Sequence, residues 1–272
     1  MIMPAYNSEK TLSRAISSTL KALRPDDELL VGLHNCTDDS ARIAASFSPD
    51  KRLSIHEVAG GGVARVLNKL IEHSRHDLIA RVDSDDICLP WKFRVQVKQM
   101  AKHDVDFLFS TAIVGWNNGT FALWVPQHLT SLTTSQVTSL LRGMTPLVQP
   151  TMLAKKSALE SNGGYLDVPG EDLDLWLRAA VAGSTFFRAA LPTLVYNLSP
   201  NQLSKQDWYL NGWKNSESVA ANRTILAKRH RSRLLGWKEK LEIIGPLLPQ
   251  NFRRLRDFES ELQKLDQRES ES

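Results

Sequence analysis

The spacing of apolar and polar residues predicts that strands and helices alternate along the first 80 residues. Apolar side chains recur at helical spacing through 12–23 and 63–73, and a Thr-Asp-Asp-Ser capping sequence opens another helix at 37–40. Short apolar runs, typical of buried strands, lie between these segments. The expected strands are 1–3, 28–33, 53–58 and 77–80, and the expected helices are 12–23, 37–47 and 63–73. Alternation with short connections indicates a parallel sheet covered by helices on both faces.

The pattern after residue 87 predicts a second group of elements. The expected elements are a helix at 89–100, strands at 106–114, 120–125 and 149–154, and helices at 157–161 and from 171 onward. Asn117-Asn118-Gly119 lies between the first two of these strands and is a hairpin signal. The last helix opens with Glu171 and Asp172, and acidic residues in a first turn are favoured by the helix dipole. These two carboxylates can therefore be explained either by the helix dipole alone or by a catalytic role.

The segment Asp83-Ser84-Asp85-Asp86 carries the densest cluster of charge next to a predicted strand. It follows the apolar run 77–80, and strand geometry would place Asp83 and Asp85 on one side, about 6–7 Å apart. Like charges at this spacing repel, and a cation with a preference for oxygen ligands, Mg²⁺ or Mn²⁺, would stabilise them. The alternative is an acidic turn or helix cap in solvent.

The carboxyl ends of parallel strands are where such folds bind ligands. Three segments fall at these ends: Pro4-Ala5-Tyr6-Asn7, Leu33-His34-Asn35 and Asp83 to Asp86. Neither GxGxxG after the first strand nor GxxxxGK[ST] occurs, so the signatures of dinucleotide-binding and P-loop folds are missing. Gly60-Gly61-Gly62 is interpreted as a flexible turn.

Composition indicates a globular chain with a full core. Of its 272 residues 42% are hydrophobic, and its two cysteines, Cys36 and Cys88, provide no disulfide framework and favour a reducing compartment. We expect no signal peptide, because no basic segment precedes a long apolar run, and no apolar run approaches the ~20 residues of a membrane span. Met1-Ile2-Met3 is short for a first strand, so we expect that the chain begins late relative to its relatives.

The net charge of +4 comes entirely from residues 205–272. Residues 1–204 hold 20 basic and 20 acidic residues, which leaves 34 − 20 = 14 basic and 30 − 20 = 10 acidic residues beyond them. Basic residues alternate with Trp, Leu and Phe through 205–256, which suits a peripheral contact with an anionic membrane surface. Helices packed on the preceding domain with solvated charges explain the pattern equally. We expect no nucleic-acid binding, because no reader motif accompanies the charge.

Taken together, four motifs resemble those of the inverting family-2 glycosyltransferases with a GT-A fold. Their order and spacing match over residues 1–204, although each motif alone is weak. The motifs are Met3 to Asn7, Ala80 to Ile87 with Leu89, Pro90, Arg94 and Gln96 following, Gly163-Gly164-Tyr165 with Glu171 to Arg178, and Gln202-Leu203-Ser204. The resemblance implies a GT-A domain at 1–204, a mainly parallel sheet flanked by helices, followed by a helical, basic extension at 205–272.

The resemblance also implies a role for each motif residue. A nucleotide-diphosphate sugar would bind to Pro4, Ala5, Tyr6, Asn7, His34, Asp83, Ser84 and Asp85. Asp83 and Asp85 would hold Mn²⁺ or Mg²⁺, and Asp172 would be the general base for a glycan or lipid-linked acceptor. We hypothesise that Glu171 beside it raises the pKa of Asp172. The expected location is cytoplasmic, with contact at the inner face of the membrane.

The sequence departs from the family pattern at two places. Relatives usually carry two acidic residues after the second strand, where this chain has Leu33 and His34. Relatives also often have a late histidine that binds the metal, whereas Tyr196-Asn197-Leu198-Ser199 supplies none. These departures leave two alternatives open: a sugar-nucleotide-binding protein without catalysis, and a nucleotidyltransferase, which would need a Gly-rich basic loop after the first strand.

Overall fold

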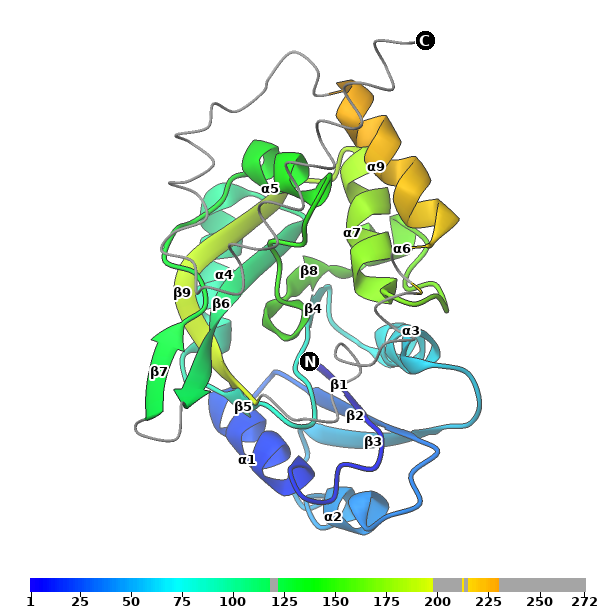
Figure 1. The fold of residues 1–272 in the computed structure, drawn as a ribbon. Coiled ribbons are helices and arrows are strands. Elements are labelled where there is room, and N and C mark those ends of the chain that lie inside the picture. Colours follow the sequence, from blue (N-terminus) through cyan, green and yellow to red (C-terminus); the bar gives the residue numbers. More distant parts are fainter. Residues whose placement is uncertain (118–121, 198–211, 213–214, 230–272) are drawn as a thin grey trace.

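The computed structural model describes residues 1–117, 122–197, 212 and 215–229. Its first half is a parallel three-stranded sheet in the order β1-β2-β3, with Pro4 opposite Gly32 and Leu33 opposite Glu57. The elements are β1 (Ile2–Ala5), α1 (Leu12–Ala22), β2 (Leu29–His34), α2 (Ser40–Ala45), β3 (Leu53–Val58), α3 (Val63–His73) and β4 (Leu78–Ala80). This order confirms the predicted alternation (Figure 1).

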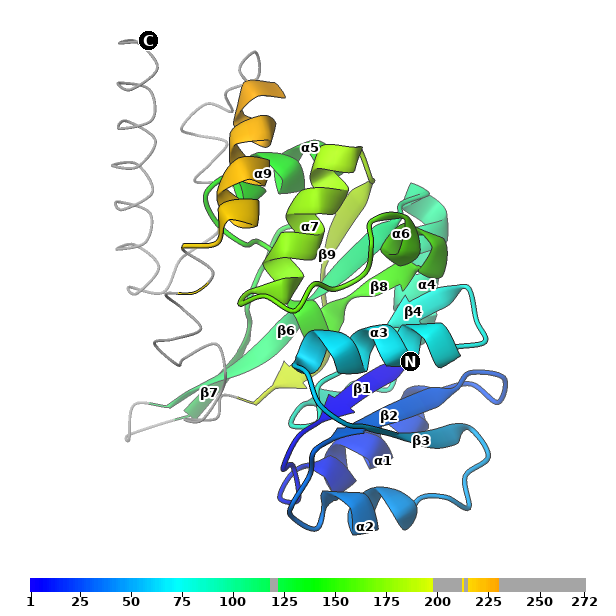
Figure 2. The same ribbon diagram turned by 90° about the vertical axis from the view of Figure 1, so that its right-hand side faces the viewer.

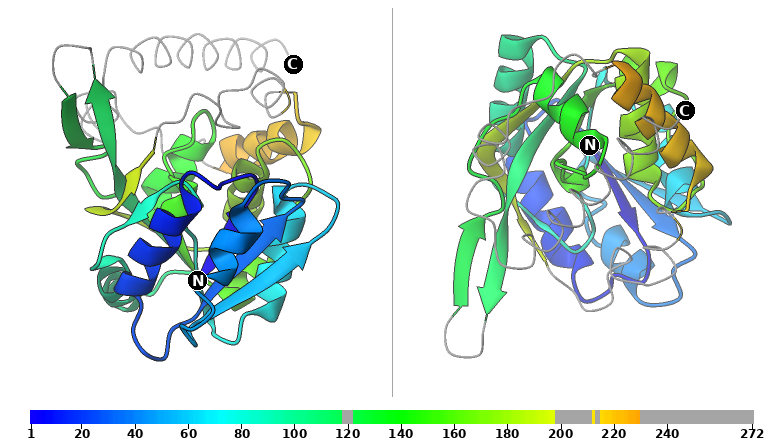
Figure 3. Two further views of the ribbon diagram at one scale, coloured as in Figure 1. Left: turned by 90° about the horizontal axis from the view of Figure 1, so that it is seen from below. Right: turned by 45° about the horizontal axis from the view of Figure 1, so that its top comes forward.

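Helices cover both faces of this first sheet. Ile2 and Leu30 belong to the core beneath α3, whereas Met3 and Val31 belong to the core beneath α1. Figure 2 shows α3 on one side of the strands, and the left view of Figure 3 shows α1 and α2, in dark and medium blue, together on the other. A Cβ at Gly32 would lie 2.5 Å from Cγ1 of Val66, so glycine there permits the close packing of α3.

The second half forms a larger sheet in the order β4-β8-β6-β9-β5, with β7 paired to β6. Most neighbours in it are antiparallel, and β6 and β9 run parallel. A parallel bridge between Ile2 and Arg81 joins the two sheets. The remaining elements are β5 (Ile87–Cys88), α4 (Lys92–His103), β6 (Phe107–Asn117), β7 (Ala122–Pro126), α5 (Thr134–Leu141), the 3₁₀ turn η1 (Gln149–Thr151), β8 (Leu153–Lys155), α6 (Lys156–Ser161), α7 (Glu171–Ala182), β9 (Phe186–Tyr196) and α9 (Glu217–Arg229). Taken together, the two joined sheets are therefore mixed, and β1, β2 and β3 near the N-terminus form the fully parallel part.

In this half, one sequence prediction is confirmed and one needs correction. The hairpin is present as β6 and β7, with Asn117 opposite Ala122, although residues 118–121 lie outside the described chain. The strand expected at 149–154 is wrong in its first half, because 149–151 form a 3₁₀ turn and the strand begins at Leu153. Pro150 has no N–H to give to a sheet and instead occupies the first turn of η1.

One helix of the predicted C-terminal extension is described, and it packs on the preceding domain. Val219 and Leu226 of α9 are 2% and 1% exposed and belong to the same core as Trp176 of α7. Figures 1 and 2 both show α9 lying beside α7. For this helix the packed alternative holds, while most of the segment 205–256 lies outside the described residues. None of the described helices is both long and apolar enough to cross a membrane.

Candidate functional site

A cleft of about 820 Å³ opens at the carboxyl ends of β1, β2 and β4. All ten site residues expected from the sequence line it, together with Arg81, Gln149, Tyr196 and Asn197. The ten are Pro4, Ala5, Tyr6, Asn7, His34, Asp83, Ser84, Asp85, Glu171 and Asp172. The volume falls within the range of pockets for small ligands and cofactors, about 300–1,000 Å³.

Hydrogen bonds fix the loop after β1 against its neighbours. Asn7, which has a positive φ of 44°, accepts a hydrogen bond from the backbone N–H of Thr37 at 2.9 Å. The N–H of Ser8 donates to Oγ of Ser40 at 2.8 Å. The hydroxyls of Ser8 and Ser84 share a hydrogen bond of 2.8 Å, which connects the loop to the acidic segment. Three chain segments distant in sequence are thus held together at one edge of the cleft.

Two aromatic rings lie on the cleft wall that β1 and β2 provide. Tyr6 is 62% exposed, and its ring centroid lies 5.8 Å from that of His34. Leu33, by contrast, is 5% exposed and packs in the core beneath α1. Asp38 also lines the cleft, but its carboxylate already accepts the N–H groups of Glu9 and Ser40.

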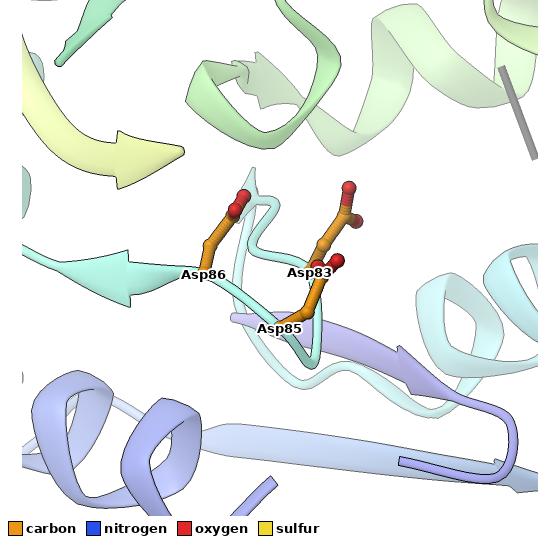
Figure 4. Close-up of side chains that lie close together, drawn as sticks. All are labelled: Asp83, Asp85 and Asp86. Atoms are coloured by element: carbon orange, nitrogen blue, oxygen red, sulfur yellow. The ribbon is translucent and has the colours of Figure 1, made fainter. Parts of the chain in front are cut away.

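The acidic segment places three carboxylates together. Asp83, Asp85 and Asp86 each offer an oxygen, and these oxygens all lie within 4.8 Å of one another. Figure 4 shows that the three side chains come from one loop and point to the same side of it. Arg81, 4% exposed, pairs with Asp83 through Nη2 and Oδ1 at 2.9 Å. Arg81 therefore forms an ion pair with one of the three carboxylates.

The pKa values of two carboxylates in the cluster, Asp85 and Asp86, are raised. Burial and the neighbouring charge of Asp83 raise the pKa of Asp85 to about 6. Burial, followed by the charges of Asp83 and Asp85, raises the pKa of Asp86 well above its ordinary value. Oδ1 of Asp86 accepts the N–H of Asn197 at 3.0 Å, while its buried Oδ2 has no hydrogen-bond partner among the described residues. An orphaned carboxylate oxygen beside two others fits a divalent cation that prefers oxygen ligands.

Glu171 and Asp172 reach the cleft from the first turn of α7. Gly170, with φ of 75°, turns the chain into the helix, and the N–H of Leu173 donates to Oδ1 of Asp172 at 2.7 Å. Burial raises the pKa of Asp172, against the effects of this hydrogen bond and of Arg81. Among neighbouring carboxylates, that of Asp83 adds to the rise. Burial is therefore the principal cause of the shift, and the contribution of Glu171 stays a hypothesis.

The sequence interpretation missed several residues that shape the site. Lys92 is fully buried, and its Nζ donates to the carbonyl oxygens of Arg81 at 2.8 Å and Pro150 at 2.5 Å. Burial and the nearby carboxylates, Asp83 first among them, raise the pKa of Tyr196 at the end of β9. Lys92 stands next to Phe93 on the inward face of a helix, and a lysine in such a position is a signal that could have been noted.

Comparison with known families and curated proteins agrees with this geometry. The profile of the family described as glycosyl transferase family 2 matches residues 1–162. The O-antigen biosynthesis glycosyltransferase WbnJ of Escherichia coli is 26% identical over 183 residues, which are 65% of this chain and 70% of that protein. The UDP-Glc:alpha-D-GlcNAc-diphosphoundecaprenol beta-1,3-glucosyltransferase WfgD of Escherichia coli is 31% identical over 131 residues, 48% of this chain and 52% of that protein. The chain thus spans between half and seven tenths of these relatives.

Solved structures with the same fold include two nucleotide-sugar complexes. TarS 1–349 of S. aureus in complex with UDP-GlcNAc aligns with a TM-score of 0.64 at 19% identity, covering 94% of this chain and 79% of that one. The mannosyltransferase PcManGT of Pyrobaculum calidifontis, in complex with GDP-Man and Mn2+, aligns with a TM-score of 0.55 at 16% identity, covering 89% and 66%. At identities this low, the alignments show a shared fold and no more, and this fold is the GT-A fold expected from the sequence.

Proposed function

The chain belongs to glycosyl transferase family 2, and from this premise we propose that it is a metal-dependent, inverting enzyme that transfers a sugar from a nucleoside diphosphate to a hydroxyl acceptor. The observation that carries the proposal is the convergence of Asp83, Asp85 and Asp172 in one cleft. The names of WbnJ and WfgD support an acceptor that belongs to a surface polysaccharide or its lipid-linked precursor.

The donor would lie along the carboxyl ends of β1, β2 and β4. Tyr6 and His34 offer rings to a nucleobase, and the hydroxyl of Ser84 and the acidic cluster face the diphosphate. UDP-GlcNAc in TarS and GDP-Man in PcManGT are different nucleotides, so the fold accommodates more than one base. We therefore propose a nucleoside-diphosphate sugar as the donor class and leave its base to experiment.

Asp83 and Asp85, with Asp86 beside them, would hold Mn²⁺ or Mg²⁺. When bound, the ion would neutralise the negative charge that develops on the departing diphosphate. Arg81 stabilises Asp83 by its ion pair and keeps this carboxylate oriented at the cleft. The buried Oδ2 of Asp86 has no hydrogen-bond partner among the described residues, which supports Asp86 as a third carboxylate ligand of the metal ion.

Asp172 would act as the general base. Its carboxylate accepts the proton of the acceptor hydroxyl while the hydroxyl oxygen forms a bond to the anomeric carbon. The bond between this carbon and the diphosphate oxygen breaks with its electron pair leaving on the diphosphate. Because the hydroxyl oxygen attacks from the opposite face, the configuration at the carbon is inverted. A base whose pKa is raised by burial binds a proton more strongly, which favours this transfer.

The experiment is a transfer and hydrolysis assay with UDP-, GDP-, CDP- and dTDP-sugars, with wild type and Asp172→Asn. We expect wild type to turn over one donor class, and Asp172→Asn to lose at least about 100-fold in kcat while nucleotide affinity stays unchanged. The rate of wild type should fall as the pH is lowered through the raised pKa of Asp172, at a higher pH than an ordinary aspartate would require. Full turnover by Asp172→Asn would exclude it as the base.

A non-catalytic sugar-nucleotide-binding protein is the second candidate. The buried position of Leu33 favours it, because that side chain cannot contact a ligand in the cleft. Binding of one nucleotide sugar without hydrolysis or transfer, under conditions where metal is saturating, would support this candidate over the enzyme.

A further inference from the structure

Tyr196, the last residue of β9, is fixed at the cleft by the segments around it. It pairs with Val114 of β6, and the strand pairs with β5 on its other side. The N–H of the next residue, Asn197, is the group that donates to Oδ1 of Asp86 at 3.0 Å. The end of β9 is therefore tied directly to the acidic segment.

The ring of Tyr196 is held by apolar contacts at the wall of the cleft. It packs against the small cluster of Ala112, Val148 and Leu194. Val148 also lines the cleft, and its carbonyl accepts both the N–H of Thr151 at 2.9 Å and the hydroxyl of Thr151 at 2.6 Å. Because its packing surface is itself fixed, the ring is held in place before any ligand arrives, which lowers the cost of ordering it on binding.

The hydroxyl of Tyr196 is a hydrogen-bond donor that faces the cleft without a partner in the protein. The residue is partly exposed and lines the cleft, and its hydroxyl makes no hydrogen bond with another described residue. Unlike the unpartnered polar atoms buried in the described chain, this hydroxyl is reached by solvent. A ligand in the cleft can therefore reach it as well. The raised pKa of Tyr196 keeps its proton in place at neutral pH.

The surroundings of Tyr196 place it between the proposed metal site and the proposed base. Besides burial, the charges that act on its hydroxyl are those of Asp83, Asp86, Asp85 and Asp172, in this order of strength. The first three form the acidic cluster, and under the proposed function the bond that breaks lies between this cluster and Asp172. Carboxylates accept hydrogen bonds and donate none, so a ligand oxygen in this region needs a donor from another group.

We propose that Tyr196 binds the donor, with its hydroxyl donating a hydrogen bond to an oxygen next to the bond that breaks. This oxygen belongs either to the diphosphate or to the transferred sugar, and the experiment distinguishes the two. A phenol suits this place because it supplies an O–H without adding a charge to the acidic cluster. The inference rests on the proposed function, since it names a further contact within that site.

The test uses Tyr196→Phe, which removes the hydroxyl and keeps the ring on its apolar cluster. Thr193→Val is the matched control, because it removes a buried hydroxyl of the same strand outside the cleft lining. Hydrolysis of UDP-, GDP-, CDP- and dTDP-sugars, calorimetric binding of the four nucleoside diphosphates and thermal unfolding are measured for each protein. We expect Tyr196→Phe to lower kcat/KM for donor hydrolysis about tenfold or more at an unchanged thermal midpoint, whereas Thr193→Val should behave as wild type.

Each pattern of results has a distinct meaning. A lower kcat/KM together with weaker binding of the nucleoside diphosphate by Tyr196→Phe assigns the contact to the diphosphate. A lower kcat/KM with unchanged binding of the nucleoside diphosphate assigns it to the transferred sugar. An active wild type whose constants Tyr196→Phe retains, or an equal loss in Thr193→Val, overturns this inference alone. A wild type that turns over no nucleotide sugar contradicts the proposed function, and unchanged nucleoside diphosphate affinity in Tyr196→Phe would then overturn the inference too.

Discussion

At the scale of single residues, the acidic segment carries negative charge that opposes folding of the ligand-free protein. Asp85 is raised in pKa to about 6 by burial and by Asp83, so its negative charge at neutral pH opposes folding. The folded protein binds more protons than the unfolded chain between the ordinary aspartate pKa and about 6. The stability contribution of this group is therefore complete at acid pH and is lost as the pH rises through about 6.

Asp85→Asn should consequently stabilise the metal-free protein at neutral pH. A shift from 3.8 to about 6, discounted for the exposed part of the side chain, corresponds to about 1–2 kcal/mol at pH 7. The difference from wild type should vanish below about pH 3, where the wild-type carboxyl is protonated in both the folded and the unfolded state. Urea unfolding in the presence of a chelator at both pH values measures it. A variant less stable than wild type at pH 7 would show that the charge is compensated in the folded protein.

At the scale of elements, one arginine connects the helix that carries the proposed base to the turn before it. Arg178 of α7 pairs with Asp174 at 2.7 Å and donates to the carbonyls of Asn162 and Gly164. The same Asp174 accepts the hydroxyl of Ser218 from α9. Asp174 and Arg178, later in α7, thus hold the helix in place, while Glu171 and Asp172 in its first turn line the cleft.

We expect Arg178→Lys to lower the free energy of unfolding by about 1–3 kcal/mol. A lysine keeps the charge but cannot serve three acceptors in the fixed geometry of a guanidinium. Arg94→Lys, at an exposed position of α4, is the control and should change stability by less than about 0.5 kcal/mol. Equal effects of the two substitutions in chemical denaturation would contradict the role given to Arg178.

The sequence was sufficient to predict the first sheet and the strand ends that carry the cleft. Regular apolar spacing in α1 and α3, and the capping residues Thr37 to Ser40, are local signals. The position of Asp83 at the end of the fourth strand then follows from topology alone, without knowledge of distant contacts.

The second sheet depended on contacts that local patterns do not encode. β9 includes Arg188 and Pro192, which interrupt the apolar pattern of a buried strand. Arg188 is nevertheless 2% exposed, because it donates to the carbonyls of Pro146 and Thr130, residues far away in sequence. For the same reason the hydrogen bonds from Lys92 and Gln96 to the backbone of residues 150–151 could be recognised only once the fold brought these segments together.

At the scale of the whole molecule, α9 extends the core of the transferase domain. Leu226 is 1% exposed within this core, whereas its neighbour Ile225 is 40% exposed. We expect Leu226→Ala to cost about 2–4 kcal/mol in the free energy of unfolding, and Ile225→Ala less than about 1 kcal/mol. Unfolding followed by tryptophan fluorescence should remain a single transition in both variants. A separate early transition in Leu226→Ala would indicate that α9 unfolds independently, as an extension with its own boundary near residue 204 would.

The most direct test of the whole account is calorimetric binding of UDP, GDP, CDP and dTDP, each with and without Mn²⁺, to wild type and to Asp85→Ala. The account predicts that one nucleotide binds wild type only when Mn²⁺ is present, and that Asp85→Ala loses this binding. Binding that is equally strong without metal, or that survives Asp85→Ala, would contradict a metal-dependent nucleotide site at the acidic segment.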